Sequence, residues 1–239
     1  MKPLSIAIPT HDDRLHWYLQ TIKNVHDDPR VGEIRIGHDG TSQNTIDKDE
    51  LVFKAYPIVK LHFSINKEGV FRNKYKTLSV CENESVCLWD SDNIFDVDYL
   101  DALERAGDFL ENESTIRCPV KALPRFDFSQ WENHIILKTT AKLYMDKPAF
   151  CVHMNTGNYV VPREAYLRVL KPFFDSGEQS PNCCDVIWQN YHLLSAGLNM
   201  IFIPGMQYQH TDHPDSTYRQ FHDKEPGLTE VWQGKIKEL

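Results

Sequence analysis

The sequence predicts an α/β fold, with a mostly parallel central sheet flanked by helices. In the first half of the chain, short apolar runs alternate with amphipathic stretches whose apolar residues have helical spacing. The connections between them are short, which is typical of parallel strands joined by right-handed crossovers. No internal repeat, low-complexity tract or linker divides the 239 residues, so we expect one domain.

Four strands and four helices are expected in the first half. A buried apolar run forms the first strand, and Asp12 and Asp13 are placed to cap the helix that follows it. The segments predicted as strands cover residues 4–9, 33–37, 59–64 and 85–89. The segments predicted as helices cover residues 15–25, 47–56, 70–80 and 98–110.

The second half has a less regular pattern. Apolar runs predict strands at residues 116–120, 159–161 and 199–203. Helical spacing predicts helices at residues 131–144, 185–196 and 228–239. The middle one of these helices is strongly amphipathic and ends at Gly197, a residue type common just past helix C-termini.

The composition excludes some classes of partner. The formal net charge is −8, from 26 basic and 34 acidic residues, whereas recognition of nucleic acid or an anionic membrane needs clustered Lys and Arg. No apolar run approaches the roughly 20 residues that cross a bilayer, and the six cysteines form no CxxC pair. We therefore expect a cytoplasmic protein with no transmembrane segment and no nucleic-acid partner.

Polar loops with carboxylates follow three of the four strands expected in the first half. These loops cover residues 10–13, 38–42 and 90–93. The carboxyl ends of parallel strands meet at one edge of a sheet, and ligands bind outside that edge. All three loops are therefore expected to line one crevice.

Asp90-Ser91-Asp92 is the first candidate site. Two carboxylates at positions i and i+2 follow a buried strand, so one can bind a hard cation while the other reaches a ligand hydroxyl. Mg²⁺ and Mn²⁺ prefer oxygen ligands and commonly share one or two carboxylates with substrate phosphates. Taken alone, such a triplet is more often a pair of solvated loop acids or a helix cap.

Four further positions have both a structural and a functional interpretation. Asp39 belongs either to a turn or to a site that hydrogen-bonds a nucleobase or ribose. Arg72, in the segment that opens the third helix, either packs locally or projects into the crevice. Asp185 either caps a helix or acts as a general base. His210 follows a Pro-Gly turn and can complete a metal shell, with His213 as the second candidate.

Taken in order, these segments resemble the inverting family 2 glycosyltransferases with a GT-A fold. The match runs from the strand ending at Thr10, through Asp39-Gly40, to the Asn-x-x-Gly-x-x-Arg-Asn stretch at residues 66–73. It continues through Leu88-Trp89-Asp90-Ser91-Asp92-Asn93 and reappears as Asp185 opening a helix, followed by the loop that contains His210. The resemblance covers roughly residues 4–100 well and the second half only at these landmarks.

The resemblance implies one GT-A domain, with a nucleotide-sugar-binding half at about residues 1–100 and an acceptor-binding half at about residues 101–239. It implies a UDP-linked donor and a Mn²⁺ or Mg²⁺ cofactor held by Asp92 and His210. Asp90 would contact the ribose or sugar, and Asp185 would deprotonate the acceptor hydroxyl. The residues implied to hold the uridine-type nucleoside are Thr10, Asp12, Asp39 and Arg72.

Some positions depart from the family pattern. Cys184-Asp185 leaves one carboxylate where the family has an acidic pair, His38 replaces an expected acid, and no Gln-x-x-Arg-Trp motif is present. We therefore expect the transfer of one sugar to a glycan or other hydroxyl acceptor, with inversion. The alternatives are a retaining GT-A transferase, a catalytically inactive GT-A module that binds a nucleotide sugar or glycan, and a nucleotidyltransferase. The last is disfavoured because the loop after the first strand is acidic and lacks glycine.

Overall fold

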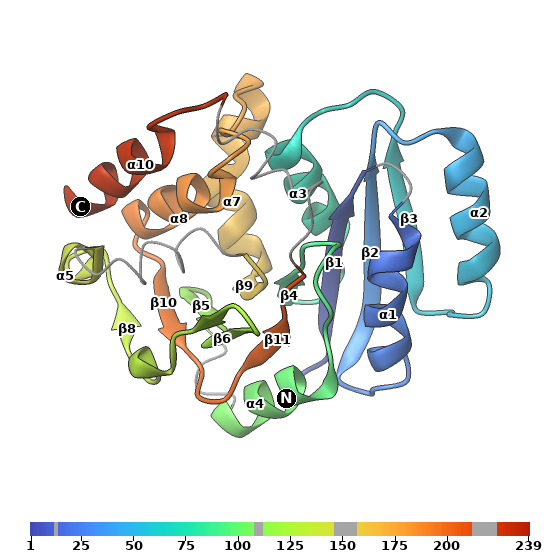
Figure 1. Cartoon of the computed structure of the whole chain (residues 1–239), viewed down its shortest axis with the longest axis horizontal. Coiled ribbons are helices and arrows are strands. Elements are labelled where there is room, and N and C mark those ends of the chain that lie inside the picture. Colours follow the sequence, from blue (N-terminus) through green and yellow to red (C-terminus); the bar gives the residue numbers. More distant parts are fainter. Residues whose placement is uncertain (12–13, 108–111, 146–156, 212–223) are drawn as a thin grey trace.

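The computed structural model describes residues 1–11, 14–107, 112–145, 157–211 and 224–239. A twisted sheet of eight strands runs through the molecule, and helices lie on both of its faces (Figure 1). The strand order is β3-β2-β1-β4-β9-β5-β10-β8. This arrangement confirms the predicted α/β class with a mostly parallel central sheet. No helix in the described residues is long and apolar enough to cross a membrane.

The first half forms the parallel part of the sheet, as predicted. Its strands are β1 (Leu4–Thr10), β2 (Val31–Asp39), β3 (Val59–Ser64) and β4 (Ser85–Leu88). Its helices are α1 (Leu15–Val25), α2 (Gln43–Phe53), α3 (Val70–Ser79) and α4 (Val97–Ala106). Helix α2 begins earlier than predicted because the Ser42 side chain accepts a hydrogen bond from the backbone of Thr45 and caps it. The expected caps Asp12 and Asp13 lie outside the described residues.

The second half completes the sheet with antiparallel pairs. Strand β9 (Tyr159–Pro162) pairs antiparallel with both β4 and β5 (Thr115–Cys118). Strand β10 (Asn199–Phe202) lies between β5, to which it is parallel, and β8 (Ile135–Ile136), to which it is antiparallel. A second sheet contains β11 (Gln207–Gln209), β6 (Lys121–Leu123) and β7 (Phe126–Asp127). The helices are η2 (Ser129–Trp131), α5 (Ala141–Met145), α7 (Arg163–Ser176), α8 (Asp185–Ser195) and α10 (Leu228–Lys237).

The helix predicted at residues 131–144 is wrong. Asn133 takes a φ of 62°, in the left-handed region, which ends the short turn before it. The next residues pair with β10, so Ile136 contributes to the core from a strand. Helix α7 was not anticipated from the sequence. It contains Pro172, and an interior proline usually ends a helix.

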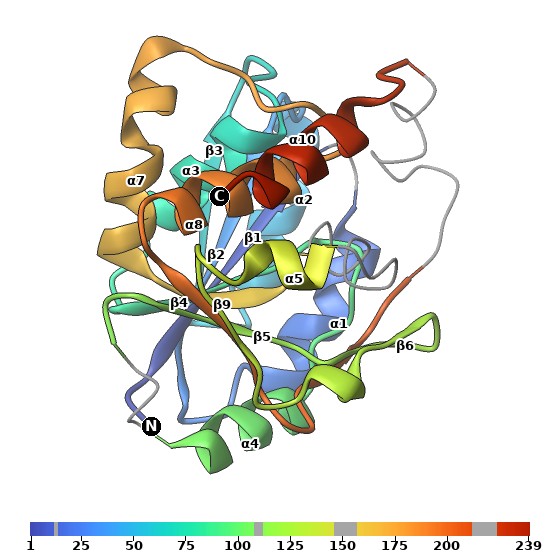
Figure 2. The same ribbon diagram turned by 90° about the vertical axis from the view of Figure 1, so that its left-hand side faces the viewer.

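Two apolar cores occupy the two faces of the sheet. One lies between the sheet and helices α1 and α4, and the other lies between the sheet and helices α3, α7 and α8 (Figure 2). Helix α3 approaches β2 closely at Gly37, where an added Cβ would lie 1.8 Å from the Thr77 hydroxyl. Because α3 is held so close, its side chains reach the carboxyl end of β4 and the helices beyond it.

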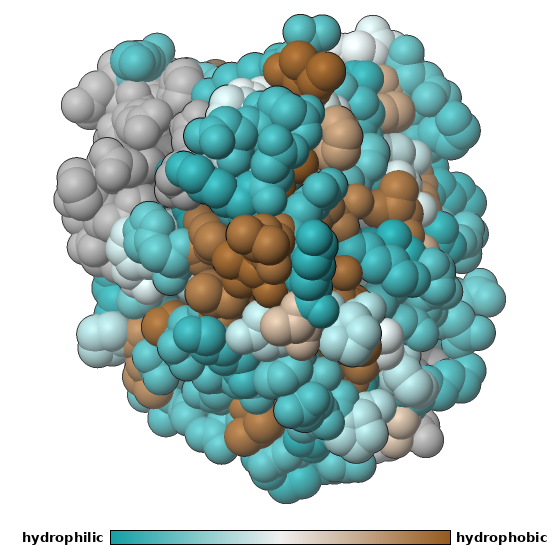
Figure 3. All heavy atoms as spheres, turned by 90° about the vertical axis from the view of Figure 1, so that its right-hand side faces the viewer, coloured by the Kyte–Doolittle hydropathy of each residue, from teal (hydrophilic) through white to brown (hydrophobic). Residues whose placement is uncertain are grey.

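The side of the molecule at α2 and β3 is largely hydrophilic, with a hydrophobic patch near its centre (Figure 3). Strand β3 is an edge strand, and the exposed apolar side chains of these two elements include Leu51 and Phe63. Lys60 on the same strand carries a charge, a common device that discourages pairing with another chain.

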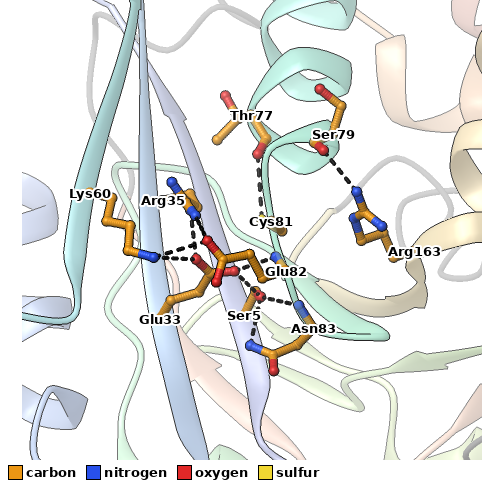
Figure 4. Close-up of polar contacts among 10 residues, drawn as sticks. All are labelled: Ser5, Glu33, Arg35, Lys60, Thr77, Ser79, Cys81, Glu82, Asn83 and Arg163. Carbon is orange, nitrogen blue, oxygen red and sulfur yellow. Dashed lines mark hydrogen bonds and ion pairs between the residues drawn. The ribbon is translucent and has the colours of Figure 1, made fainter.

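A network of polar side chains joins the strands at their amino ends, opposite the expected crevice (Figure 4). The buried Glu33 carboxylate accepts hydrogen bonds from Ser5 Oγ at 2.7 Å and from Arg35 Nε at 2.6 Å. The Glu82 carboxylate forms ion pairs with Arg35 and Lys60. The Glu82 backbone amide donates a hydrogen bond to the Glu33 carboxylate. Glu33 therefore links β1 and β2 to the turn before β4.

We expect Glu33→Gln to lower the free energy of unfolding by about 2–3 kcal/mol, because it breaks a buried charge pair and weakens charge-assisted hydrogen bonds. Urea unfolding followed by circular dichroism measures this change. The matched control is Glu84→Gln, which removes an ion pair with Lys2 whose two side chains are 82% and 71% exposed. We expect almost no effect from the control. Equal effects of the two variants would contradict a structural role for this network.

Candidate active site

A tight turn follows β4 and presents the Asp90-Ser91-Asp92 triplet. Trp89 is fully buried, and its backbone amide continues the sheet by donating to the Ala7 carbonyl at 2.8 Å. The Trp89 indole N–H donates to the Asn93 carbonyl at 3.1 Å, and the Asn93 amide donates to the Asp90 carbonyl at 3.1 Å. The turn is therefore fixed from its inner side.

Asn158, the residue just before the antiparallel strand β9, holds Asp90. Its side-chain oxygen accepts from the Asp90 amide at 2.8 Å, and its side-chain amide reaches Asp90 Oδ2 at 3.5 Å. Asn158 has a φ of 65°, and its carbonyl accepts a hydrogen bond from the buried Tyr99 hydroxyl at 2.7 Å. The sequence places Asn158 in a loop expected on the acceptor side, but it does not predict the contact with Asp90.

Lys74 joins the triplet to the predicted base. Its Nζ lies 2.9 Å from Asp185 Oδ2 and 3.3 Å from Asp90 Oδ1. Lys74 is not among the predicted site residues, although the sequence carries a signal for it. Lys74 interrupts the apolar stripe that Phe71 and Leu78 form on α3, and it is only 5% exposed.

Asp185 is the first residue of α8 and is buried. Gln189, one turn later, donates its side-chain amide to the same oxygen, Oδ2, at 3.0 Å. The Tyr166 hydroxyl of α7 donates a hydrogen bond to the side-chain oxygen Oε1 of Gln189 and so fixes the orientation of that side-chain amide. Burial raises the pKa of Asp185, while the charge and hydrogen bond of Lys74 oppose this rise.

The segments that carry Asp92 and His210 lie side by side. Ile94 and Gln209 exchange backbone hydrogen bonds of 3.0 and 3.2 Å. The Thr211 amide donates to Asn93 Oδ1 at 3.2 Å. The neighbouring segments that contain Asp12 and His213 lie outside the described residues.

The side chains of Asp92 and His210 have further neighbours. Arg14 Nη1 lies 3.7 Å from Asp92 Oδ2, and the His210 ring centroid lies 5.7 Å from that of Phe126. No group of three or more His, Cys, Asp or Glu able to hold a metal occurs within the described ranges. That Asp92 and His210 hold a divalent ion stays a prediction.

The three described residues expected to hold the nucleoside lie at the ends of β1 and β2 and on α3. Thr10 is 2% exposed, and its hydroxyl has no hydrogen-bond partner among the described residues. Asp39 accepts the backbone amides of Glu68 at 2.6 Å and Gly69 at 3.0 Å, so it anchors the loop before α3. Arg72 donates to the Phe174 carbonyl at 2.7 Å and covers its ring. Whether they hold a nucleoside stays a prediction.

No protein-family model matches the chain, and no curated protein matches it. Among solved structures, Staphylococcus aureus TarS 1-349 superposes with a TM-score of 0.64 at 14% identity, over 97% of this chain and 65% of that one. The same fragment in complex with UDP-GlcNAc gives a TM-score of 0.67 at 13% identity, over 97% of this chain and 66% of that one. The chain has a GT-A-like glycosyltransferase fold. It spans 65% of the TarS fragment and 42% of the longer TarS chain, which matches with a TM-score of 0.61 at 14% identity.

The GT-A-like fold explains which predicted residues meet. Asp90 follows a parallel strand of the first half, whereas Asp185 opens a helix of the second half. Their carboxylates come within hydrogen-bonding range of one ammonium, that of Lys74. The carboxyl edge of the sheet therefore carries a cluster of charges built from both halves of the chain.

Proposed function

We propose that this chain is a glycosyltransferase that moves one sugar from a nucleotide-sugar donor to a hydroxyl of a glycan or other acceptor. The observation that carries the proposal is the meeting of Asp90 and Asp185 at Lys74, at the carboxyl edge of a GT-A-like sheet. The fold is shared with TarS, which was crystallised with UDP and with UDP-GlcNAc. A UDP-linked sugar is therefore our first choice of donor.

The donor is proposed to lie across the carboxyl ends of β1, β2 and β4. Thr10 and Asp39, with Asp12 and Arg72, are proposed to hold the nucleoside. The buried Thr10 hydroxyl supports this, because an unsatisfied buried polar group is costly unless a ligand or water pairs with it. Asp90, fixed by Asn158, is proposed to contact the ribose or sugar.

Asp92 and His210 are proposed to hold Mn²⁺ or Mg²⁺. When bound, such an ion stabilises the negative charge that develops on the departing diphosphate. The adjacent placement of the two segments supports this assignment. The hydrogen bonds of Trp89 and Asn93 fix the turn and so hold the Asp92 backbone in place for metal binding.

Asp185 is proposed to act as the general base. A carboxylate removes the acceptor proton while the acceptor oxygen bonds to the anomeric carbon and the bond to the diphosphate oxygen breaks. Lys74 and Gln189 both bond to Oδ2 and neither bonds to Oδ1, so Oδ1 is our choice for the atom that accepts the proton. Direct displacement of this kind inverts the anomeric configuration, and the configuration of the product separates inverting from retaining transfer.

A thermal-shift panel of nucleotide sugars with Mn²⁺ tests the donor. We expect UDP-linked sugars to raise the unfolding temperature and GDP- or ADP-linked sugars to leave it unchanged. A ligand at 100 times its dissociation constant stabilises the folded state by about 2.7 kcal/mol. Slow hydrolysis of the bound donor without acceptor would separate an active transferase from an inactive binding module. A panel without any stabilising nucleotide sugar would overturn the proposed function.

A further inference from the structure

We propose that Lys74 is a positioning residue of this site, whose ammonium keeps Asp185 in the carboxylate form and couples it to Asp90. This inference rests on the proposed function, in which Asp185 is the base. Lys74 touches neither donor nor acceptor in this scheme and acts through Asp185. The inference explains why a lysine occupies a core position of α3.

The contacts of Lys74 carry the inference. Its side chain extends from an apolar stripe of α3 to a point between two carboxylates, at 2.9 Å from Asp185 and 3.3 Å from Asp90. A buried ammonium is costly unless it is paired. Burial alone would lower the pKa of Lys74, but Asp185 and Asp90 outweigh burial and raise it, so the side chain stays charged.

The other groups that face this centre carry no opposing charge. They include Tyr166 on α7, Tyr159 on β9, Gln189 on α8 and the thiol of Cys184 just before α8, whose pKa burial raises. Burial raises the pKa of both tyrosines, so their hydroxyls stay neutral across the pH range of an assay. Among the described residues, the charge balance at Asp185 is therefore set by Lys74 and Asp90.

The balance of protons follows from these charges. Before transfer, the site holds one ammonium and two carboxylates. When Asp185 takes the acceptor proton, it becomes neutral, and Lys74 remains paired with Asp90. Without the ammonium, burial and the Asp90 charge would both favour a protonated Asp185 before the acceptor arrives, and a protonated carboxyl cannot act as a base.

The test compares pH profiles of kcat/KM for the wild type, Lys74→Met, Lys74→Gln and Lys74→Arg. An opposite charge at this range lowers a carboxyl pKa by about 1–3 units. We expect the acidic limb of both neutral variants to move up by about 1–3 pH units, so that transfer is lost at the acidic end of the profile and recovers at alkaline pH. Lys74→Arg keeps the charge and is expected to keep the limb near its wild-type position.

The controls separate this inference from the proposed function. Lys171→Met removes a surface lysine that pairs with Asp175 on α7, and its profile is expected to match the wild type. A loss of equal size at every pH in Lys74→Gln would overturn the positioning role while leaving Asp185 as the base. If Lys74→Met fails to fold, the Gln and Arg variants decide the outcome. Full transfer by Asp185→Asn would instead overturn the proposed base, and with it the reason for this test.

Discussion

Asp185→Asn is expected to lower the transfer rate by on the order of 10²-fold or more, which is the scale of general-base catalysis. Asparagine keeps the size of the side chain but cannot accept the acceptor proton. Donor binding is expected to persist, because the described residues proposed to hold the donor lie on β1, β2, α3 and the turn after β4. Single-turnover transfer and donor thermal shift, measured on the same preparation, check both parts.

The matched control for this variant is Asp175→Asn. Asp175 is an exposed acid on α7 that pairs only with Lys171 in the described hydrogen bonds and ion pairs. We expect its transfer rate to equal that of the wild type. Near-normal transfer by Asp185→Asn would remove Asp185 from the reaction, whereas loss of donor binding in that variant would indicate a structural defect.

The first half of the fold was predictable because its signals are local. The periodicity of a short segment predicts its secondary structure. This holds for the apolar run Leu4–Thr10, a strand, and for the amphipathic segment Leu15–Val25, a helix. The second half depends on pairing across long separations. Ile135 and Ile136 form a strand because β10 lies beside them, and nothing in their immediate sequence distinguishes that outcome from a helix.

The candidate site shows the same division. A triplet after a buried strand and an acid at a helix start were visible as patterns, so Asp90, Asp92 and Asp185 were singled out. The contact that joins two of them runs through Lys74, and such a contact exists only once α3 is packed against Gly37. Pattern reasoning finds residues that can carry chemistry, whereas packing decides which of them meet.

The second large effect is expected from Asp92. Removing divalent cations from the wild type with a chelator should abolish most transfer, and added Mn²⁺ should restore it. Asp92→Asn is expected to lose on the order of 10²-fold or more and to resist rescue, because charge neutralisation by a metal supplies several kcal/mol to such reactions. Transfer assays across a Mn²⁺ titration measure both effects.

Asp96→Asn provides the matched control from the same loop. Asp96 caps α4 by accepting the Asp98 amide, and asparagine is an equally good cap, so folding and transfer are expected to stay unchanged. If transfer proceeds fully in chelator, Asp92 has no metal to hold. If Asp92→Asn fails but chelation has no effect, the carboxylate serves the turn through its neighbour Arg14 instead. Asp92 is supported as the metal ligand only if chelation abolishes transfer by the wild type, Asp92→Asn loses transfer, and Asp96→Asn transfers normally.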